Sequence, residues 1–494
     1  MTADVRATRL PAELHADPAR VVAQLFLPGE ELPQLRSRAS QIVARVLELG
    51  EDEVDELAAG LTADFGGRHA GYEDTLQRHA AIVAAHVPEG FELSAARTLL
   101  LGATFTTEYA VEGAALCNPS AVWHPDQSDL PAGAARVAIS LRGVGEGHRS
   151  TIGFCTAVVG PGASWTFDRR PLPARVGLVS AGRWRRRHFR TVLSDYGPHD
   201  VATRAVLDAL PTQFGTQELE QALAGLPRNL LMRPGTALTI EQLRTLAGSA
   251  YSVVFDADSR LDQRVLMPVV VEESGGVEDA RFTRVVTDNE TVEYRATYTA
   301  YDGHRIMPRI ITSPDLRQFR SHRISGAAAR NKGMALFPRT VKGQHLALCR
   351  TDGESTMLAT SEDGYSWGQP RILQRPRAAW EMLQVGNCGP PIETEQGWLV
   401  LTHGVGPMRR YSIGAILLDL DDPTRVLGHL EQPLITPGND ERDGYVPNVV
   451  YSCGGMVHDG LLWIPLGIDD ARIGVAYAPL DDVLAALLRS SSNS

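Results

Sequence analysis

The sequence lacks long hydrophobic segments. No apolar run approaches the roughly 20 residues that a membrane-spanning helix needs. The opening stretch, MTADVRATRLPAELHADP, contains no apolar signal-peptide core. We therefore expect a cytoplasmic protein with no membrane partner.

Cysteine is also scarce, and the spacing of the few cysteines excludes two kinds of scaffold. The chain has five, an odd number, with no CxxC pair and no Cys/His cluster at metal-ligand spacing. They are Cys117, Cys155, Cys349, Cys388 and Cys453. This pattern predicts small buried thiols in a reducing compartment, with neither a disulfide framework nor a metal site.

Excess positive charge is absent as well. The formal net charge is −11, which argues against nucleic acid as a partner. The basic run at 183–188, RWRRRH, is a local exception. For this run we favour a solvated basic face or an oligomer contact over an anion-binding patch. The chain also has no phosphate-cradling glycine loop and no serine nucleophile elbow, so nucleotide and esterase chemistry have little support.

The 494 residues divide into segments of different texture. Apolar residues recur at helical spacing between about 30 and 100, so we expect residues 1–104 to form a helical N-terminal module. From residue 105 to 485 short β-branched and aromatic runs alternate with Gly, Asp and Pro turns, which predicts a mainly β domain. A helical insertion is expected at about 198–248, and residues 486–494 are expected to be a disordered tail.

A repeated motif points to the kind of β architecture. The form Thr-Ser-x-Asp-x-x-x-aromatic occurs at 312–319 and again 48 residues later at 360–367. A period of roughly 40 to 50 residues suits one four-stranded propeller blade. We therefore favour a β-propeller over a sandwich, with residues from distant parts of the chain converging on a central cavity.

The stretch at 275–282, GGVEDARF, places two acids and an arginine beside paired glycines. Taken alone, it is typical of a solvated turn. Other polar groups lie in similar turn-bounded, apolar settings further along the chain, each with an ordinary structural explanation of its own. Read in order, however, they form a series of motifs: CNPSAV at 117–122, SLR at 140–142, EDAR at 278–281, NKGMALFP at 331–338, LCR at 348–350, THG at 402–404, YSIGAILLD at 411–419, GYVPNVVYSCG at 444–454 and GIDDARIGVA at 467–476.

This series resembles glycoside hydrolase family 130, the family of β-mannoside phosphorylases and related β-mannosidases. The resemblance covers about residues 105–485 and leaves the helical segment before it unexplained. It implies a five-bladed β-propeller with a helical N-terminal extension and a helical insertion. It also implies an inverting displacement at the anomeric carbon of a β-mannosyl unit, which releases α-mannose 1-phosphate when inorganic phosphate attacks.

The resemblance assigns residues to roles. Asp279 matches the single general acid, whose proton would travel through a sugar hydroxyl, and Ala280 stands where the family motif has proline. The substrate-binding and supporting residues would be Asn118, Ser120, Glu278, Arg281, Tyr451 and Asp470. The phosphate-binding residues would be Arg142, Lys332, Arg350, His403 and Tyr411. No metal or cofactor is implied beyond phosphate as co-substrate, because a cationic pocket can orient an attacking anion without a second carboxylate.

Two other functions stay open. In an exo-acting β-mannosidase on the same fold, water would attack with Glu441 or Asp443 as the base. In a carbohydrate-binding propeller, no mannoside would be turned over. The two helical segments are expected either to cover the cavity or to form a homo-oligomer interface.

Overall fold

The computed structural model describes residues 5–29, 37–286, 291–439 and 441–491. The chain is mainly β, as predicted from its texture after residue 105. Within the described part of the chain, no helix is both long and apolar enough to cross a bilayer.

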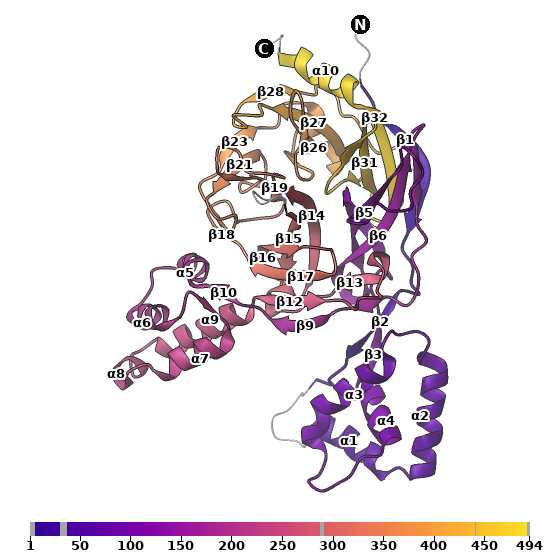
Figure 1. Cartoon of the computed structure of the whole chain (residues 1–494), viewed down its shortest axis with the longest axis vertical. Coiled ribbons are helices and arrows are strands. Elements are labelled where there is room, and N and C mark those ends of the chain that lie inside the picture. Colours follow the sequence, from indigo (N-terminus) through magenta and orange to yellow (C-terminus); the bar gives the residue numbers. More distant parts are fainter. Residues whose placement is uncertain (1–4, 30–36, 287–290, 440, 492–494) are drawn as a thin grey trace.

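The longer strands lie around a common centre (Figure 1) and belong to four sheets, the largest of which has twelve strands and contains the second and third of the five groups named below. The first holds β1 (Thr8–His15), β29 (Val450–Tyr451), β30 (Met456–His458), β31 (Leu461–Ile468) and β32 (Arg472–Pro479). The second holds β4 (Ala115–Trp123), β5 (Ala135–Val144), β6 (Ser150–Gly160) and β7 (Ser164–Phe167). The third holds β9 (Leu178–Ala181), β12 (Tyr251–Val254), β14 (Gly276–Val286), β15 (Val292–Tyr301), β16 (Ile306–Ser313) and β17 (Gln318–Arg323).

The remaining two groups complete the arrangement. The fourth holds β19 (Ala335–Leu336), β20 (His345–Cys349), β21 (Thr356–Ser361) and β23 (Arg371–Gln374). The fifth holds β24 (Gln384–Asn387), β25 (Ile392–Thr394), β26 (Gly397–Val405), β27 (Tyr411–Leu418) and β28 (Val426–His429). The other strands are short. Three pairs form separate two-stranded sheets: β2 (Val21–Leu25) with β3 (Thr106–Ala110), β10 (Trp184–Arg185) with β11 (Gln213–Phe214), and β18 (Ser325–Gly326) with β22 (Ser366–Trp367). Strand β13 (Arg264–Leu266) pairs with β6 and with β8 (Arg175–Val176).

The N-terminal segment is helical only in part. Helices α1 (Arg38–Glu48), α2 (Glu51–Phe65), α3 (Tyr72–Val83) and α4 (Ala95–Thr104) pack around a core that includes Val43, Leu101 and Phe105. They lie below the strand groups in Figure 1. The expectation of a helical module from residue 1 differs from the structure at residues 8–15. These residues form β1, which pairs with β32 from the other end of the chain.

A second helical segment lies between two strands that pair with each other. Helices α5 (Arg186–Ser194), α6 (Val201–Ala209), α7 (Thr216–Ala224), α8 (Arg228–Leu231) and α9 (Thr236–Gly248) come between β9 and β12, which are antiparallel partners. They share a core of their own that includes Phe189, Val206 and Leu246. The helices begin at Arg186, earlier than the expected start near residue 198.

The C-terminal segment ends in a helix. Helix α10 runs from Leu480 to Ser491 and contacts β27, β28 and β32. Val483 and Leu487 are fully buried in this contact. Residues 486–491 are therefore ordered by apolar packing, contrary to the expected disordered tail, and residues 492–494 of that expectation lie outside the described residues.

The repeated Thr-Ser-x-Asp motif makes the same turn twice. Asp315 Oδ1 accepts hydrogen bonds from the backbone N–H groups of Arg317 and Gln318 at 2.9 and 2.8 Å. Asp363 Oδ1 accepts from those of Tyr365 and Ser366 at 2.9 and 2.8 Å. In each copy the aspartate replaces a missing backbone acceptor, which is how Asx turns close.

The strand pairing between the second and third groups, which joins β6 to β14, consists of one residue pair at Gly276. Its only partner in β6 is Ser150, in a parallel bridge. Gly276 has φ 127°, and a Cβ there would lie 2.6 Å from the Ser150 backbone nitrogen. A glycine is required at this point for both reasons.

We expect Gly276→Ala to lower the free energy of unfolding by about 3 kcal/mol, because it adds backbone strain and overpacking together. Gly303→Ala is the matched control, since Gly303 has φ 95° but open space around it, and it should lose about 1 kcal/mol. Urea denaturation of both variants measures the difference. Equal losses would show that the approach to Ser150 is not a constraint.

Candidate active site

Residues from all five strand groups line one cavity of about 240 Å³. Ten of the predicted residues meet there: Asn118, Arg142, Asp279, Arg281, Lys332, Arg350, His403, Tyr411, Tyr451 and Asp470. They are far apart in the sequence and converge because nine of them lie within or just after a strand that reaches the centre, while Lys332 lies in the loop between β18 and β19.

Asp279 reaches the cavity because β14 contains a bulge. The register of β14 against β15 shifts between Glu278 and Arg281, and Asp279 adopts φ 59°. Asn118 lies in a similar irregularity of β4 with φ 51°, and its Nδ2 donates a short hydrogen bond to Asp279 Oδ1. Bulges re-aim side chains in this way next to active sites.

Arg281 fixes the backbone and the carboxylate of Asp279 together. Its guanidinium is 1% exposed and donates to the carbonyl of Asp279 (2.7 Å), the carbonyl of Cys388 (2.8 Å) and the hydroxyl of Tyr451 (2.9 Å). Its Nη2 also lies 3.7 Å from Asp279 Oδ2. Arg281 is thus a buried positioning cation that ties β14 to the fifth and first strand groups.

The cations around Asp279 favour its ionised form. Burial alone would raise the pKa of the carboxyl. The charges of Arg281, Lys332 and Arg142, with the hydrogen bond from Asn118, outweigh burial and lower the pKa. In the unliganded cavity Asp279 is therefore a carboxylate surrounded by positive charge.

Glu278 has a different task from its neighbour. It is 5% exposed and does not line the cavity. Its Oε2 lies 2.5 Å from Arg142 Nη2, and its Oε1 forms a short ion pair with Lys332 Nζ. Glu278 thus holds two cations, from the second and fourth strand groups, at the edge of the cavity.

Arg350 and His403 form the other side of the cavity. Arg350 Nη1 lies 2.9 Å from His403 Nε2 and 2.8 Å from the side-chain amide oxygen of Gln384, in the amide orientation that satisfies both of its ends. Burial, and then the charge of Arg350, lower the pKa of His403 well below its usual value. A neutral His403 can accept a hydrogen bond from Arg350, whose side chain lines the cavity.

Aromatic rings and a second carboxylate complete the lining. The ring of His403 lies 5.0 Å from that of Tyr451 and 6.1 Å from that of Tyr411. Asp470 has φ 48°, and burial raises its pKa to about 6. These groups offer apolar faces and a hydrogen-bonding carboxyl, the combination that sugar rings and hydroxyls require.

Two of the predicted residues do not line the cavity. Ser120 is fully buried, and its hydroxyl accepts a hydrogen bond from the N–H of Phe282 (3.0 Å), so it joins β4 to β14. Glu278 lies behind the lining residues, where it pairs with Arg142 and Lys332. The sequence reading also missed four lining residues: Gln384, Arg409, Val446 and Val449. Val446 and Val449 lie within the motif at 444–454, in which only Tyr451 was assigned a role, and Gln384 lies in β24, whose sequence carries no catalytic pattern.

The residues proposed as a hydrolytic base lie elsewhere. Glu441 is 5% exposed, forms a short ion pair with Arg9 and accepts from the N–H of Gly438 at 2.8 Å. Neither Glu441 nor Asp443 lines the cavity. In the described ranges, no cluster of three or more His, Cys, Asp or Glu side chains is arranged to hold a metal ion.

The comparisons with known proteins agree with this geometry. The family model described as β-1,4-mannooligosaccharide phosphorylase matches residues 257–489. The chain is 34% identical to the β-1,2-mannobiose phosphorylase of Thermoanaerobacter sp. (strain X514) over 249 residues, which are 49% of this chain and 80% of that relative. The chain belongs to glycoside hydrolase family 130.

Two further proteins to which the chain is similar are also named as phosphorylases. The 1,2-β-oligomannan phosphorylase of Thermoanaerobacter sp. (strain X514) is 32% identical over 45% of this chain and 75% of its own length. A solved structure, the β-1,2-mannobiose phosphorylase of Listeria innocua in complex with β-1,2-mannobiose, is 21% identical over 77% of this chain and 93% of that one, with a TM-score of 0.46. The prediction of family 130 and of a mannoside-phosphorylase type of enzyme is confirmed.

The lowered pKa of Asp279 predicts a pH dependence for this family 130 chain. A depressed pKa contributes stability above about pH 4, the value for an unfolded aspartate, and that contribution is lost as pH falls through the native pKa. We therefore expect the excess stability of the wild type over Asp279→Asn to shrink between pH 7 and pH 3. Urea denaturation at several pH values measures it, with the exposed Asp55→Asn as control for net charge. An excess that grows on acidification would mean that Asp279 is held protonated.

Proposed function

We propose that the enzyme is an inverting β-mannoside phosphorylase that releases α-mannose 1-phosphate. Asp279 is the general acid. Inorganic phosphate binds between Arg142, Lys332 and Arg350, with His403 and Tyr411 completing the pocket. The observation that carries the proposal is a buried carboxylate, Asp279, in one small cavity that Arg142, Lys332 and Arg350 also line. Such a cavity suits an anionic nucleophile, because guanidinium and ammonium groups offset its repulsion from the acid.

Phosphate binding would also favour the protonated form of Asp279. Two of the cations that lower the pKa of Asp279, Lys332 and Arg142, would be neutralised by a phosphate dianion, so the pKa of the carboxyl would rise when phosphate binds. A protonated Asp279 would then give its proton toward the glycosidic oxygen as phosphate attacks the anomeric carbon from the opposite side. Asp279 would therefore become an acid only when the nucleophile is present.

The sugar would contact the other side of the cavity. We assign hydroxyl binding to Asn118 and Asp470 and an apolar face to Tyr451. Glu278 and Arg281 hold the cations and the acid without touching the sugar. Asp470 is the second carboxylate of the lining, and as a hydrogen-bond partner of hydroxyl groups it does not need to activate water.

The architecture we propose for this function is a five-bladed β-propeller with one strand group as each blade. Support comes from the five groups around one centre, from the Asx turn repeated in the third and fourth groups, and from the pairing of β1 with β32. In this reading α1–α4 are an N-terminal extension and α5–α9 an insertion within one blade. We propose that they cover the cavity or form a homo-oligomer interface. The enzyme would need no metal or cofactor and would act in the cytoplasm.

The competing function is hydrolysis. It requires a base near the anomeric carbon, and the carboxylate of Glu441 is already bound by Arg9 and the Gly438 N–H. A charged group so engaged is poorly placed to activate water. If the same cavity bound sugars without turnover, the protein would be a carbohydrate-binding protein. Assays for product test this alternative directly.

Product analysis decides between these functions. We expect short β-mannosides to yield mannose 1-phosphate only when inorganic phosphate is present, because phosphate is the nucleophile. Release is measured for a panel of linkages with and without phosphate, with Glu441→Gln and Asp443→Asn run alongside. Free mannose formed equally without phosphate, and lost in either variant, would establish the hydrolase.

Asp279→Asn tests the acid separately from the pocket. We expect kcat to fall by about 10² to 10⁴-fold, the typical contribution of a general acid. The variant should bind inorganic phosphate at least as tightly as the wild type, because a negative charge leaves a cationic cavity. Steady-state kinetics and calorimetric titration measure the two effects, and circular dichroism confirms the fold. Full activity in the variant would remove Asp279 from the mechanism.

A further inference from the structure

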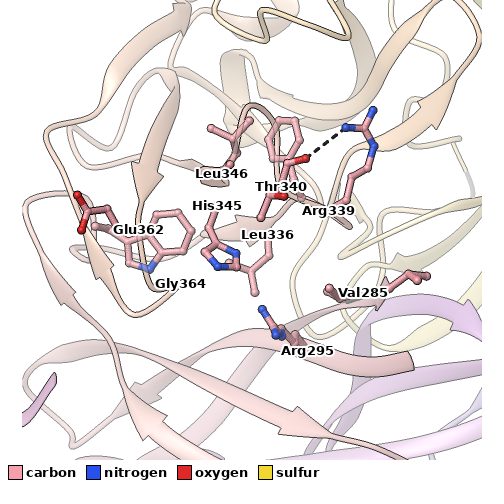
Figure 2. Close-up of a pocket in the computed structure, with 13 residues that line it drawn as sticks. Val285, Arg295, Leu336, Arg339, Thr340, His345, Leu346, Glu362 and Gly364 are labelled. Carbon is pink, nitrogen blue, oxygen red and sulfur yellow. Dashed lines mark hydrogen bonds between the residues drawn. The ribbon is translucent and has the colours of Figure 1, made fainter. Parts of the chain in front are cut away.

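A second cavity, which we call the basic cavity, lies between the start of α5 and the sheet of β15, β16 and β17. Its volume is about 460 Å³, and its lining includes Arg183, Arg185, Arg187, His188, Arg295 and Arg320. A neighbouring cavity of about 620 Å³ shares Arg295 and His345 with it. Figure 2 shows Arg295 and His345 pointing toward one another in this neighbouring cavity.

The basic cavity is separate from the site around Asp279. Strand β14 runs from Asp279 to Val285, which lines the neighbouring cavity. Six residues of extended chain span about 20 Å. The two binding regions therefore lie toward opposite ends of the same strand, and they share no lining residue.

Strand register sets two guanidinium groups side by side. Arg295 of β15 pairs with Thr312 of β16, and Thr312 pairs with Arg320 of β17. Directly paired residues point to the same face of a sheet, so the two arginines flank the Thr312 hydroxyl about 10 Å apart. One face of the sheet thus presents a cationic row toward the start of α5.

Not all of this charge is balanced. Arg295 pairs with Glu293 at 2.6 Å, Arg183 with Glu218 at 2.7 Å and Arg187 with Glu362 at 3.2 Å. Across the part of the chain that the structure describes, Arg185 and Arg320 have no carboxylate partner within ion-pair distance.

Asp363, the remaining acid of the lining, does not supply that partner. Its Oδ1 already accepts from the backbone N–H groups of its own turn. Two cations are therefore left to attract an anion into a concave site, where their field is less screened than on a flat surface.

His188 adds a neutral hydrogen-bonding group. It is 6% exposed, and burial lowers its pKa to about 4 despite a hydrogen bond to the backbone of Arg323. Its Nε2 is buried and has no partner among the described residues. The rings of Trp184 and Tyr365 pack beside it at 5.0 and 4.8 Å. A buried imidazole nitrogen without a partner is costly unless a ligand supplies one.

We propose that the basic cavity binds a phosphorylated sugar. Its phosphate lies against Arg185 and Arg320, and one of its hydroxyl groups hydrogen-bonds to His188 Nε2. Guanidinium groups bind phosphate through paired charge-assisted hydrogen bonds, and the aromatic rings offer the apolar face that a sugar ring requires. A cavity of this volume suits a small ligand. The basic run at 183–188 is therefore an anion-binding element, not a solvated face.

This inference is independent of the proposed reaction, because binding is measured without turnover. The probes are mannose 1-phosphate, inorganic phosphate and mannose, added to the full-length Asp279→Asn protein. Hydrogen–deuterium exchange locates the contact. We expect mannose 1-phosphate to slow exchange saturably in residues 183–193 and 318–323.

The variants assign the effect to the two unpaired cations. In the same background, Arg185→Ala with Arg320→Ala should raise the Kd for protection of 183–193 at least about tenfold, because two charge-assisted contacts are lost. Arg190→Ala changes an exposed arginine of α5 that lies outside the lining, and it should leave this Kd unchanged. His188→Phe should weaken mannose 1-phosphate but not inorganic phosphate.

Three results would overturn the proposal. One is an absence of protection at 183–193 under saturating mannose 1-phosphate. Another is protection that persists unchanged in the double arginine variant. The third is equal affinity for inorganic phosphate or mannose alone, since the site would then not recognise the two parts together. Failure of the mannoside assay leaves each of these readouts intact, so the two proposals are tested separately.

Discussion

The ion pairs of Glu278 with Arg142 and Lys332 are the interaction on which the candidate site depends. Three strand groups supply the three residues, so one buried carboxylate holds converging elements against the mutual repulsion of their cations. The bulge that follows Glu278 then sends the next carboxylate, Asp279, to the cavity side. The two adjacent acids thus have different roles: Glu278 balances the charge of two cations, and Asp279 is available for chemistry. A buried pair of this kind favours a single geometry more than it adds stability.

Left-handed backbone recurs at Asn118, Asp279, Asn331 and Asp470, in several of the strand groups and the loops between their strands. Such conformations cost about 1–3 kcal/mol each for residues other than glycine, although asparagine and aspartate bear them best. The surrounding sheets are long and apolar enough to absorb that cost. The packing of the strands therefore offsets the backbone strain at the centre, where polar side chains must point inward.

Sequence reasoning brought together most of the residues that line the cavity, but less of the packing around them. Asp279, Arg142 and Arg350 were assigned by the resemblance to family 130, because their motifs follow one another in the order that the family implies. Ser120 was assigned to substrate binding by the same resemblance, but it follows a register shift in β4 and its hydroxyl accepts from the N–H of Phe282 instead. The β character of residues 8–15 was missed because its partner, β32, lies at the far end of the chain. Arg409 was missed because it lies in a short loop, Pro407–Arg409, whose direction only the fold decides.

The pairing of β1 with β32 also governs how the protein must be made. Arg472 donates to Glu13 across this pair, a contact that spans 459 residues of sequence. Ribosomes add about 5–20 residues per second. The first strand therefore waits unpaired for roughly half a minute or longer before its partner emerges. Its exposed edge must be shielded during synthesis, and a nascent chain stalled before β32 would be a strong candidate for chaperone capture or for pairing with the wrong chain.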